Sequence, residues 1–415
     1  MSRGDRLDCR NIFSKTILIV TIAVAVTVVG SGLAQNVDPN KSRLRTAQEL
    51  ERRGNYNVAL RIYRGLYDLV PRNQLYYDGV KRNMLHLKLY DELTQIINTQ
   101  INLSGGRNPR FWADLGNVHY KRGDQARAQE IWQTILAQHI SQKAAYIYVA
   151  NAMIDNRLYD EAIEVYHNAR KNFNENQLFV FELANIYVLR LKYREATIEY
   201  LNYLEKNPKQ FSYIEGRIAS YTKDSEQAQS VTDVLKTRIS TSKRKYLLRK
   251  LLADLYLRVE NFEMALQEFK RLETLKDPDQ KRKGSLGKDL YFFAEKSLRA
   301  KQYQYARDAF ELILANYGAS PYRPRALYGI AISKQMEGHS AEALTNYREL
   351  IQTYPTTRWV EDASFQSAEI YFGQLFDLDL ALATYHDLIR KFPNGKYTTR
   401  AHFRIGDCYA AKEIL

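Results

Sequence analysis

Small and large apolar residues recur along this chain at a constant interval of 34 residues. A period of 34 is typical of helix–turn–helix repeats. Because one such hairpin cannot bury its apolar face alone, neighbouring hairpins must stack into a solenoid, so the pattern predicts an all-α fold. Three series carry the repeat: small residues at Gly116, Ala150 and Ala184, alanines at Ala128, Ala162 and Ala196, and aromatic residues at Trp132, Tyr166 and Tyr200.

Each repeated position has a predicted role in packing. The first small residue, such as Ala150, lies on the first helix of a unit, and the second, Ala162, lies on the following helix. Both are small because the two backbones approach closely there, at interaxial distances of roughly 8–10 Å. The aromatic residue Tyr166 follows one turn later on the same face and fills the remaining space.

This pattern resembles the tetratricopeptide repeat family, and the resemblance covers nearly all of the chain after residue 40. It implies a right-handed α-α superhelix of about ten helical hairpins plus an incomplete eleventh, with protein partners bound in its concave groove. The match is carried by Trp112, Leu115, Gly116, Gly123, Ala128 and Trp132, by Ala150, Tyr159, Ala162, Tyr166 and Ala169, and by Ala47, Gly54, Tyr56, Ala59, Tyr63 and Pro71.

Two units depart from the pattern, one at about residues 74–102 and the other at about 210–241, where Thr232 occupies an aromatic position. A weak unit lowers the coupling between its neighbours. We therefore predict a soft point at residues 210–243, between an N-terminal array at 43–209 and a C-terminal array at 244–415. The chain stops inside the first helix of an eleventh unit, so we expect a fragment of a longer protein.

The first 34 residues read as a secretory signal peptide, with a basic head from Arg3 to Lys15, an apolar run from Thr16 to Val29, and small residues at Gly32 and Ala34. Cleavage would leave Gln35 as the new N-terminus and residues 35–42 as a linker. Extended to Leu33, the apolar run could instead serve as an uncleaved anchor. The expected location is periplasmic or exported, and the alternative is an inner-membrane-anchored periplasmic domain.

The formal net charge of +14 favours anionic partners. The export signal argues against nucleic acid as that partner. Two basic clusters, residues 243–245 and 281–283, are either solvated segments or contacts for an anionic envelope component such as lipid headgroups or cell-wall polymer. Outside the N-terminal segment, no membrane contact is expected.

No spacing typical of catalysis is found. The seven histidines are scattered, and none forms a His-Glu-x-x-His pair. The segment from Gly284 to Lys288 has two residues between its glycines where a phosphate-binding loop has four. We therefore expect no enzyme activity, no cofactor and no metal.

The resemblance implies that the residue following each first-helix small residue projects toward the concave groove. The asparagines of this set offer amides that both donate and accept, which suits the backbone of an extended peptide. Alternatively, these side chains bond only to neighbouring helices or water. Ala113, Ile147 and Phe181 stand where a carboxylate clamp would need lysine. The set, which we call the ladder, comprises Gln48, Arg82, Asn117, Asn151, Asn185, Arg217, Asp254, Glu295, Glu369 and Asp407, with Ile332 as the exception.

From about residue 286 the period lengthens to 37 or 38, with longer linkers at 317–326, 354–363 and 392–401. This segment resembles the exported bacterial branch of the family, namely the Tol-Pal coordinator and the outer-membrane-assembly lipoprotein. The expected function is an exported scaffold that binds protein or peptide partners in the cell envelope. Two alternatives stay open: a substrate-recruiting arm of a larger envelope enzyme or transport complex, and a module that binds cell-wall glycan.

Overall fold

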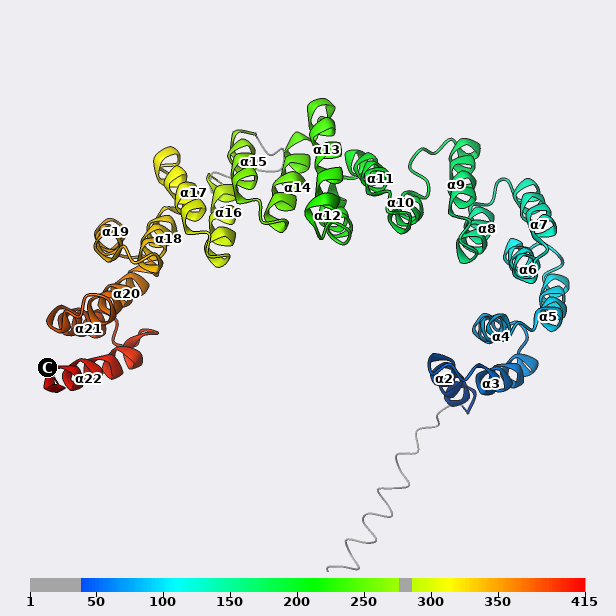
Figure 1. Ribbon diagram of the computed structural model, residues 1–415, viewed down its shortest axis with the longest axis horizontal. Helices are drawn as coiled ribbons and strands as arrows, with labels where there is room; N and C mark the ends of the chain where they lie inside the picture. The colour runs from blue at the N-terminus through cyan, green and yellow to red at the C-terminus, as the bar shows by residue number, and fades with distance from the viewer. Residues whose placement is uncertain (1–38, 276–285, 415) are drawn as a thin grey trace, which may run out of the picture. The chain divides into compact units, whose positions relative to one another are not determined.

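The computed structural model describes residues 39–275 and 286–414, and within these ranges it contains helices and no strand (Figure 1). The predicted all-α class is confirmed. The predicted signal peptide and the basic cluster at 281–283 lie outside the described residues. The chain divides into two compact units, with the boundary between Leu178 and Phe179. The predicted soft point at 210–243 falls inside the second unit and stays a prediction.

Unit 1 consists of paired antiparallel helices joined by short turns. Its helices are α2 (Pro39–Arg52), α3 (Tyr56–Leu69), α4 (Gln74–His86), α5 (Tyr90–Leu103), α6 (Pro109–Arg122), α7 (Gln125–Gln138), α8 (Lys143–Asp155) and α9 (Tyr159–Phe173).

Unit 2 continues the same arrangement. Its helices are α10 (Val180–Leu189), α11 (Tyr193–Lys206), the 3₁₀ turn η1 (Pro208–Gln210), α12 (Phe211–Ala219), α13 (Ser225–Thr241), α14 (Lys245–Arg258), α15 (Phe262–Thr274), α16 (Lys288–Arg299), α17 (Tyr303–Asn316), α18 (Arg323–Met336), α19 (Ser340–Thr353), α20 (Trp359–Gly373), α21 (Leu378–Lys391) and α22 (Thr398–Ile414).

The repeated small and aromatic residues form the core of the hairpins, as predicted. All of the repeat alanines named above are fully buried, and so are the aromatic residues that follow the second-helix alanine by four positions. The contact is tightest where glycine occupies the small position. A Cβ atom on Gly116 would lie 2.4 Å from the Trp132 indole, so α6 and α7 could not approach this closely with any other residue there.

The hairpin turns share one backbone feature. Within the described residues, one residue of each regular hairpin has a positive φ and lies two positions before the second helix begins. This left-handed conformation reverses the chain and ends the first helix. Glycine occupies the position in three turns, but larger residues hold it in the other six: Lys88, Arg157, Leu191, Glu260, Lys301 and Phe376.

The two units that depart from the repeat pattern also differ in structure. Helices α4 and α5 contact each other less extensively than the helices of the other hairpins do. Helix α12 has only nine residues, follows a 3₁₀ turn, and packs mainly on α11 and α14. No residue between α12 and α13 has the positive φ found in the regular turns. The segment 210–241 is therefore a pair of helices without a regular hairpin turn.

The longer linkers of the C-terminal part bring an aromatic residue back onto the preceding first helix. Tyr322 stacks on Tyr291 with ring centroids 4.5 Å apart, and Tyr397 stacks on Phe365 at 4.3 Å. Trp359 stacks on Tyr328 at 5.3 Å in the same way. These contacts fix the spacing between successive hairpins and explain what the extra linker residues do.

Candidate functional site

The ladder residues of unit 1 differ in their availability to a ligand. Gln48 and Asn151 are exposed and make no side-chain hydrogen bond within the described residues. Arg82 is exposed but donates two hydrogen bonds to Glu51, at 2.7 and 3.0 Å. Asn117 is only 4% exposed, and its Oδ1 accepts a 2.7 Å hydrogen bond from Asn156 Nδ2. Of the four, Gln48 and Asn151 present their polar groups most openly.

The first two ladder residues of unit 2 bond to each other. Arg217 donates to the Oδ1 of Asn185, and its Nε donates to the Tyr200 hydroxyl at 3.1 Å. Burial raises the pKa of the Tyr200 hydroxyl, and the hydrogen bond with Arg217 lowers it. Burial has the larger effect, so the pKa lies above its ordinary value. The arrangement ties the first helices α10 and α12 together through a tyrosine of the intervening helix α11.

Two acidic ladder residues of unit 2, Glu295 and Glu369, also contact neighbouring first helices, whereas Asp407 pairs within its own helix α22. Glu295 pairs with Arg325 of α18 at 2.7 Å, and both side chains are largely buried. Glu369 accepts from the Tyr385 hydroxyl at 2.6 Å and from Arg404 of α22 at 2.8 and 3.1 Å. Asp407 is exposed and pairs with Arg404 at 3.2 Å.

The same three-residue arrangement occurs in unit 1, where it was not predicted. Glu51 of α2 accepts from the Tyr63 hydroxyl at 2.8 Å and from Arg82 of α4. Burial raises the pKa of Glu51, but the hydrogen bonds from Arg82 and Tyr63 outweigh it, so the pKa lies below its ordinary value. A sequence signal exists: the repeat aromatic is tyrosine, and an acid and an arginine stand on successive first helices.

Replacing Glu369 with alanine is expected to lower the free energy of unfolding of unit 2 by about 1.5 kcal/mol, because the buried Tyr385 hydroxyl and Arg404 lose their acceptor. The midpoint of urea denaturation measures the change. The matched control is Glu349→Ala, at an exposed glutamate of α19. If both variants unfold at the same midpoint, the carboxylate does not tie the helices together.

An open pocket of about 500 Å³ lies between the first helices α2 and α4. Its wall includes two ladder residues, Gln48 and Arg82, and a stacked pair, Tyr56 and His86, with ring centroids 4.2 Å apart. Polar side chains beside a flat aromatic surface can bind a polypeptide backbone and an adjacent side chain together. We call this the α2–α4 pocket; its remaining lining residues are Glu51 and Arg52.

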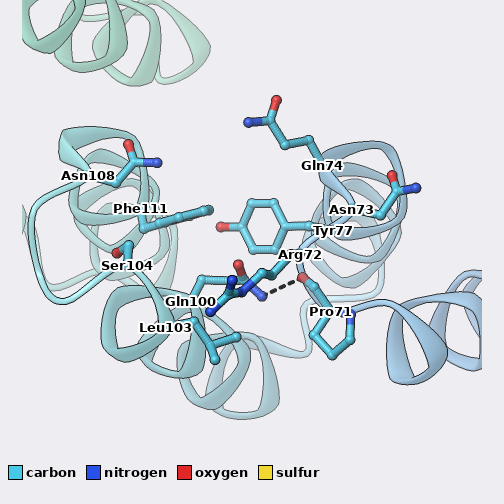
Figure 2. A pocket seen from close by; sticks show the side chains of 10 residues that line it. All are labelled: Pro71, Arg72, Asn73, Gln74, Tyr77, Gln100, Leu103, Ser104, Asn108 and Phe111. Atoms are coloured by element: carbon cyan, nitrogen blue, oxygen red, sulfur yellow. Dashed lines mark hydrogen bonds between the residues drawn. The ribbon is translucent and has the colours of Figure 1, made fainter.

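A second pocket of about 280 Å³ lies where the end of α5 meets the beginnings of α4 and α6 (Figure 2). No ladder residue lines it. Its lining is polar around an aromatic floor, and we call it the α4–α6 pocket. It is formed by Pro71, Arg72, Asn73, Gln74, Tyr77, Gln100, Leu103, Ser104, Asn108 and Phe111.

Other expected features can be located in part. Lys243 and Lys245 are exposed at the beginning of α14, so this basic cluster is accessible. Cys408 is fully buried.

Residues 39–275 and 286–414 hold no group of three or more histidine, cysteine, aspartate or glutamate side chains able to bind a metal. Of the helices in these ranges, none combines the length and the apolar character needed to cross a membrane.

Residues 285–414 match the family model YfiO, described as an outer membrane lipoprotein. This is the segment that contains the long linkers and their stacked aromatic residues, and it is a little under a third of the chain. The repeats are of the tetratricopeptide type. The predicted resemblance of the C-terminal part to exported envelope proteins of this type is thus confirmed.

Solved structures similar to this tetratricopeptide array include a complex of Naa15 and Naa10 bound to HypK, the P58(IPK) TPR domain, and the Cut9–Hcn1 hetero-tetramer of APC/C. Each is 15% identical, with TM-scores of 0.38, 0.27 and 0.25. They cover 87%, 90% and 80% of this chain, which spans 55%, 99% and 56% of theirs. At these scores nothing about partners follows for this chain. A comparison with curated proteins gave no match.

Proposed function

We propose that this chain is an exported, non-enzymatic scaffold of the cell envelope that binds extended segments of partner proteins along its first helices. The observation that carries the proposal is the α2–α4 pocket, because ladder residues from two successive first helices line one open recess. The description of the matched C-terminal family and the predicted export signal support an envelope location.

The ladder has a mixed role in this proposal. Arg82, Asn117, Asn185, Arg217, Glu295 and Glu369 connect helices, which makes the surface rigid. Gln48 and Asn151 keep their amides for a partner. A rigid surface lowers the ordering cost of binding, because few side chains need to be immobilised when the partner arrives.

The test is photo-crosslinking in intact cells, with a photoreactive amino acid at position 48 or 151 of the full chain. We expect crosslinks to one or a few envelope proteins from these positions. The matched control position is Gln129, an exposed amide on the second helix α7. The partners are then identified by mass spectrometry, and their affinities for the purified chain are measured.

In that binding measurement, the double variant Gln48→Ala, Asn151→Ala is expected to lower the affinity for the identified partner at least tenfold, because two amide contacts are lost. Gln129→Ala combined with Gln133→Ala, on the exposed face of α7, is expected to leave affinity unchanged. Asn117 is left intact because its bond to Asn156 makes it structural. An unchanged affinity in the first variant would exclude the ladder as the binding surface.

A further inference from the structure

Four exposed cations at α2 lack the ion pairs that are common elsewhere in unit 1. On each of the helices α3, α4, α6 and α8, at least one basic side chain pairs with an acid of a neighbouring element. Within the described residues no acid lies at ion-pair distance from any of these four cations, and Glu51 of α2 pairs with Arg82 instead. We call the set the α2 basic face; it comprises Lys41, Arg45, Arg52 and Arg53.

Helical spacing places these cations together, on the side of α2 that faces away from its neighbours. Lys41, Arg45 and Arg52 follow one another at intervals of four and seven residues, which are close to one and two helical turns, and the fourth cation is adjacent to the last of them. Ala47, the buried residue of α2, lies on the opposite half, where α3 and α4 pack (Figure 1). Arg43 also lies on that half, against Gly65 of α3.

The charge around this face is strongly positive. Residues 39–69, which form the α2–α3 hairpin, contain seven lysine and arginine residues and three aspartate and glutamate residues, so their formal charge is +4. Cations that stay unneutralised on one face create a local potential that attracts an anionic surface and that salt screens. No large apolar side chain of α2 is exposed, so such a contact would depend on charge and not on insertion.

We propose that the α2 basic face binds the anionic headgroups of a lipid surface without inserting into the bilayer. The guanidinium and ammonium groups would donate to headgroup phosphate oxygens. This inference goes beyond the proposed function, because it assigns a second contact on a different side of α2; Gln48 lines the α2–α4 pocket and stays available to a protein partner. It also extends membrane contact past the N-terminal segment to which the sequence confined it.

The place of α2 in the chain and the form of the face favour a lipid surface over an acidic protein. Nine residues separate the apolar run that ends at Val29 from Pro39. Nine residues span at most about 32 Å, so in the uncleaved alternative the anchor holds α2 close to the headgroups. Of the four cations, Arg52 alone lines either of the two pockets described above. A bilayer surface presents phosphates without needing a recess, whereas a specific protein partner needs shape complementarity.

The test measures how the full chain partitions onto lipid vesicles, by cosedimentation. One vesicle contains phosphatidylcholine alone, and the other contains phosphatidylcholine and phosphatidylglycerol in equal amounts. The ratio of the two partition coefficients isolates the effect of charge from any apolar insertion common to both. We expect at least tenfold stronger binding to the anionic vesicle at low salt, and a ratio that falls toward one in about 0.5 M NaCl.

The decisive variant combines Lys41→Glu with Arg45→Glu. Each cation near an anionic membrane strengthens binding roughly fivefold, so reversing two of them is expected to lower the ratio at least tenfold. The matched control combines Lys243→Glu with Lys245→Glu, at two exposed cations where α14 begins, and changes the net charge equally. It is expected to leave the ratio nearly unchanged. Thermal unfolding midpoints, followed by circular dichroism, show whether both variants remain folded.

A third measurement separates a lipid occupant from a protein occupant. With a photoreactive amino acid at position 45 of the full chain, we expect crosslinks to phospholipid in intact cells. Crosslinks from position 45 to a protein or to a second copy of the chain would overturn the assignment. So would equal binding to the two vesicles, an unchanged ratio in the α2 variant, or equal losses in both variants, since the last result would make the total charge responsible.

The two proposals can fail separately. Protein crosslinks from positions 48 and 151 that persist in the Lys41→Glu, Arg45→Glu variant would leave the scaffold function standing, whatever the vesicles show. Absence of those protein crosslinks, together with a vesicle ratio that depends on the α2 basic face, would remove the proposed function and keep the lipid contact.

Discussion

Gly329→Ala is expected to destabilise unit 2 by about 3 kcal/mol, although alanine favours a helix over glycine by about 1 kcal/mol. The reason is steric. A Cβ atom at this position of α18 would lie 2.2 Å from the Phe310 ring of α17, and that ring is fully buried. The ring cannot move without displacing the packed helices around it. Urea denaturation of the full chain, followed by circular dichroism, measures the loss.

The matched control is Gly216→Ala, on helix α12 of the same unit. A Cβ atom at Gly216 would meet no other atom within 4 Å. We expect this substitution to be neutral or stabilising by about 0.5 kcal/mol, in line with helix propensity alone. If Gly329→Ala also left the free energy of unfolding unchanged or raised it, the contact between α17 and α18 would not require glycine at position 329.

The second large effect concerns pH. Burial raises the pKa of the ladder residue Asp254 to about 7, and the negative charge of Glu215 adds to the shift, while Lys250 opposes it. An aspartate in the unfolded chain titrates near its ordinary value of 3.8. Between these pH values the folded chain holds a proton that the unfolded chain has lost, so this group lowers the stability of unit 2 as the pH rises from about 4 to 7.

Asp254→Asn removes the ionisation but keeps the size of the side chain and a donor for Glu215. At pH 8 we expect the variant to be more stable than the natural chain by about 2 to 4 kcal/mol, and at pH 4 the two should be nearly equal. Urea midpoints at pH 4, 6 and 8 measure the difference. Asp233→Asn, at an aspartate of α13, is the control. Its urea midpoint is expected to change with pH in the same way as that of the natural chain. A profile for Asp254→Asn parallel to that of the natural chain would contradict the raised pKa of Asp254.

The core of the hairpins could be predicted from sequence because the same contact recurs in every unit. Ala162 and Tyr166, for example, stand in the same relation as Ala196 and Tyr200, so each repetition is an independent sign of one packing arrangement. All four residues are fully buried. A position that is alanine or glycine in unit after unit has no other physical explanation than a close backbone approach.

The polar ladder was less predictable, because its bonding depends on residues that do not repeat. Asn117 and Asn151 occupy equivalent positions, but among the residues that the structure describes only Asn117 of the two has a side-chain partner, Asn156, which lies just beyond the end of α8. Likewise Asn185 meets Arg217 because the next ladder residue is a long cation. The α4–α6 pocket was not anticipated at all, since Asn73 and Asn108 lie in linkers outside the 34-residue pattern.

The left-handed residue in each hairpin turn has a consequence for how such arrays diversify. Side chains larger than glycine pay about 1 kcal/mol in this conformation, yet six of the turns accept them. Leu191 and Phe376 even point bulky apolar groups into solvent, at 71% and 75% exposure. The tips of the hairpins are therefore places where mutation can alter what the protein displays to its surroundings, while helix pairing, set elsewhere, is preserved.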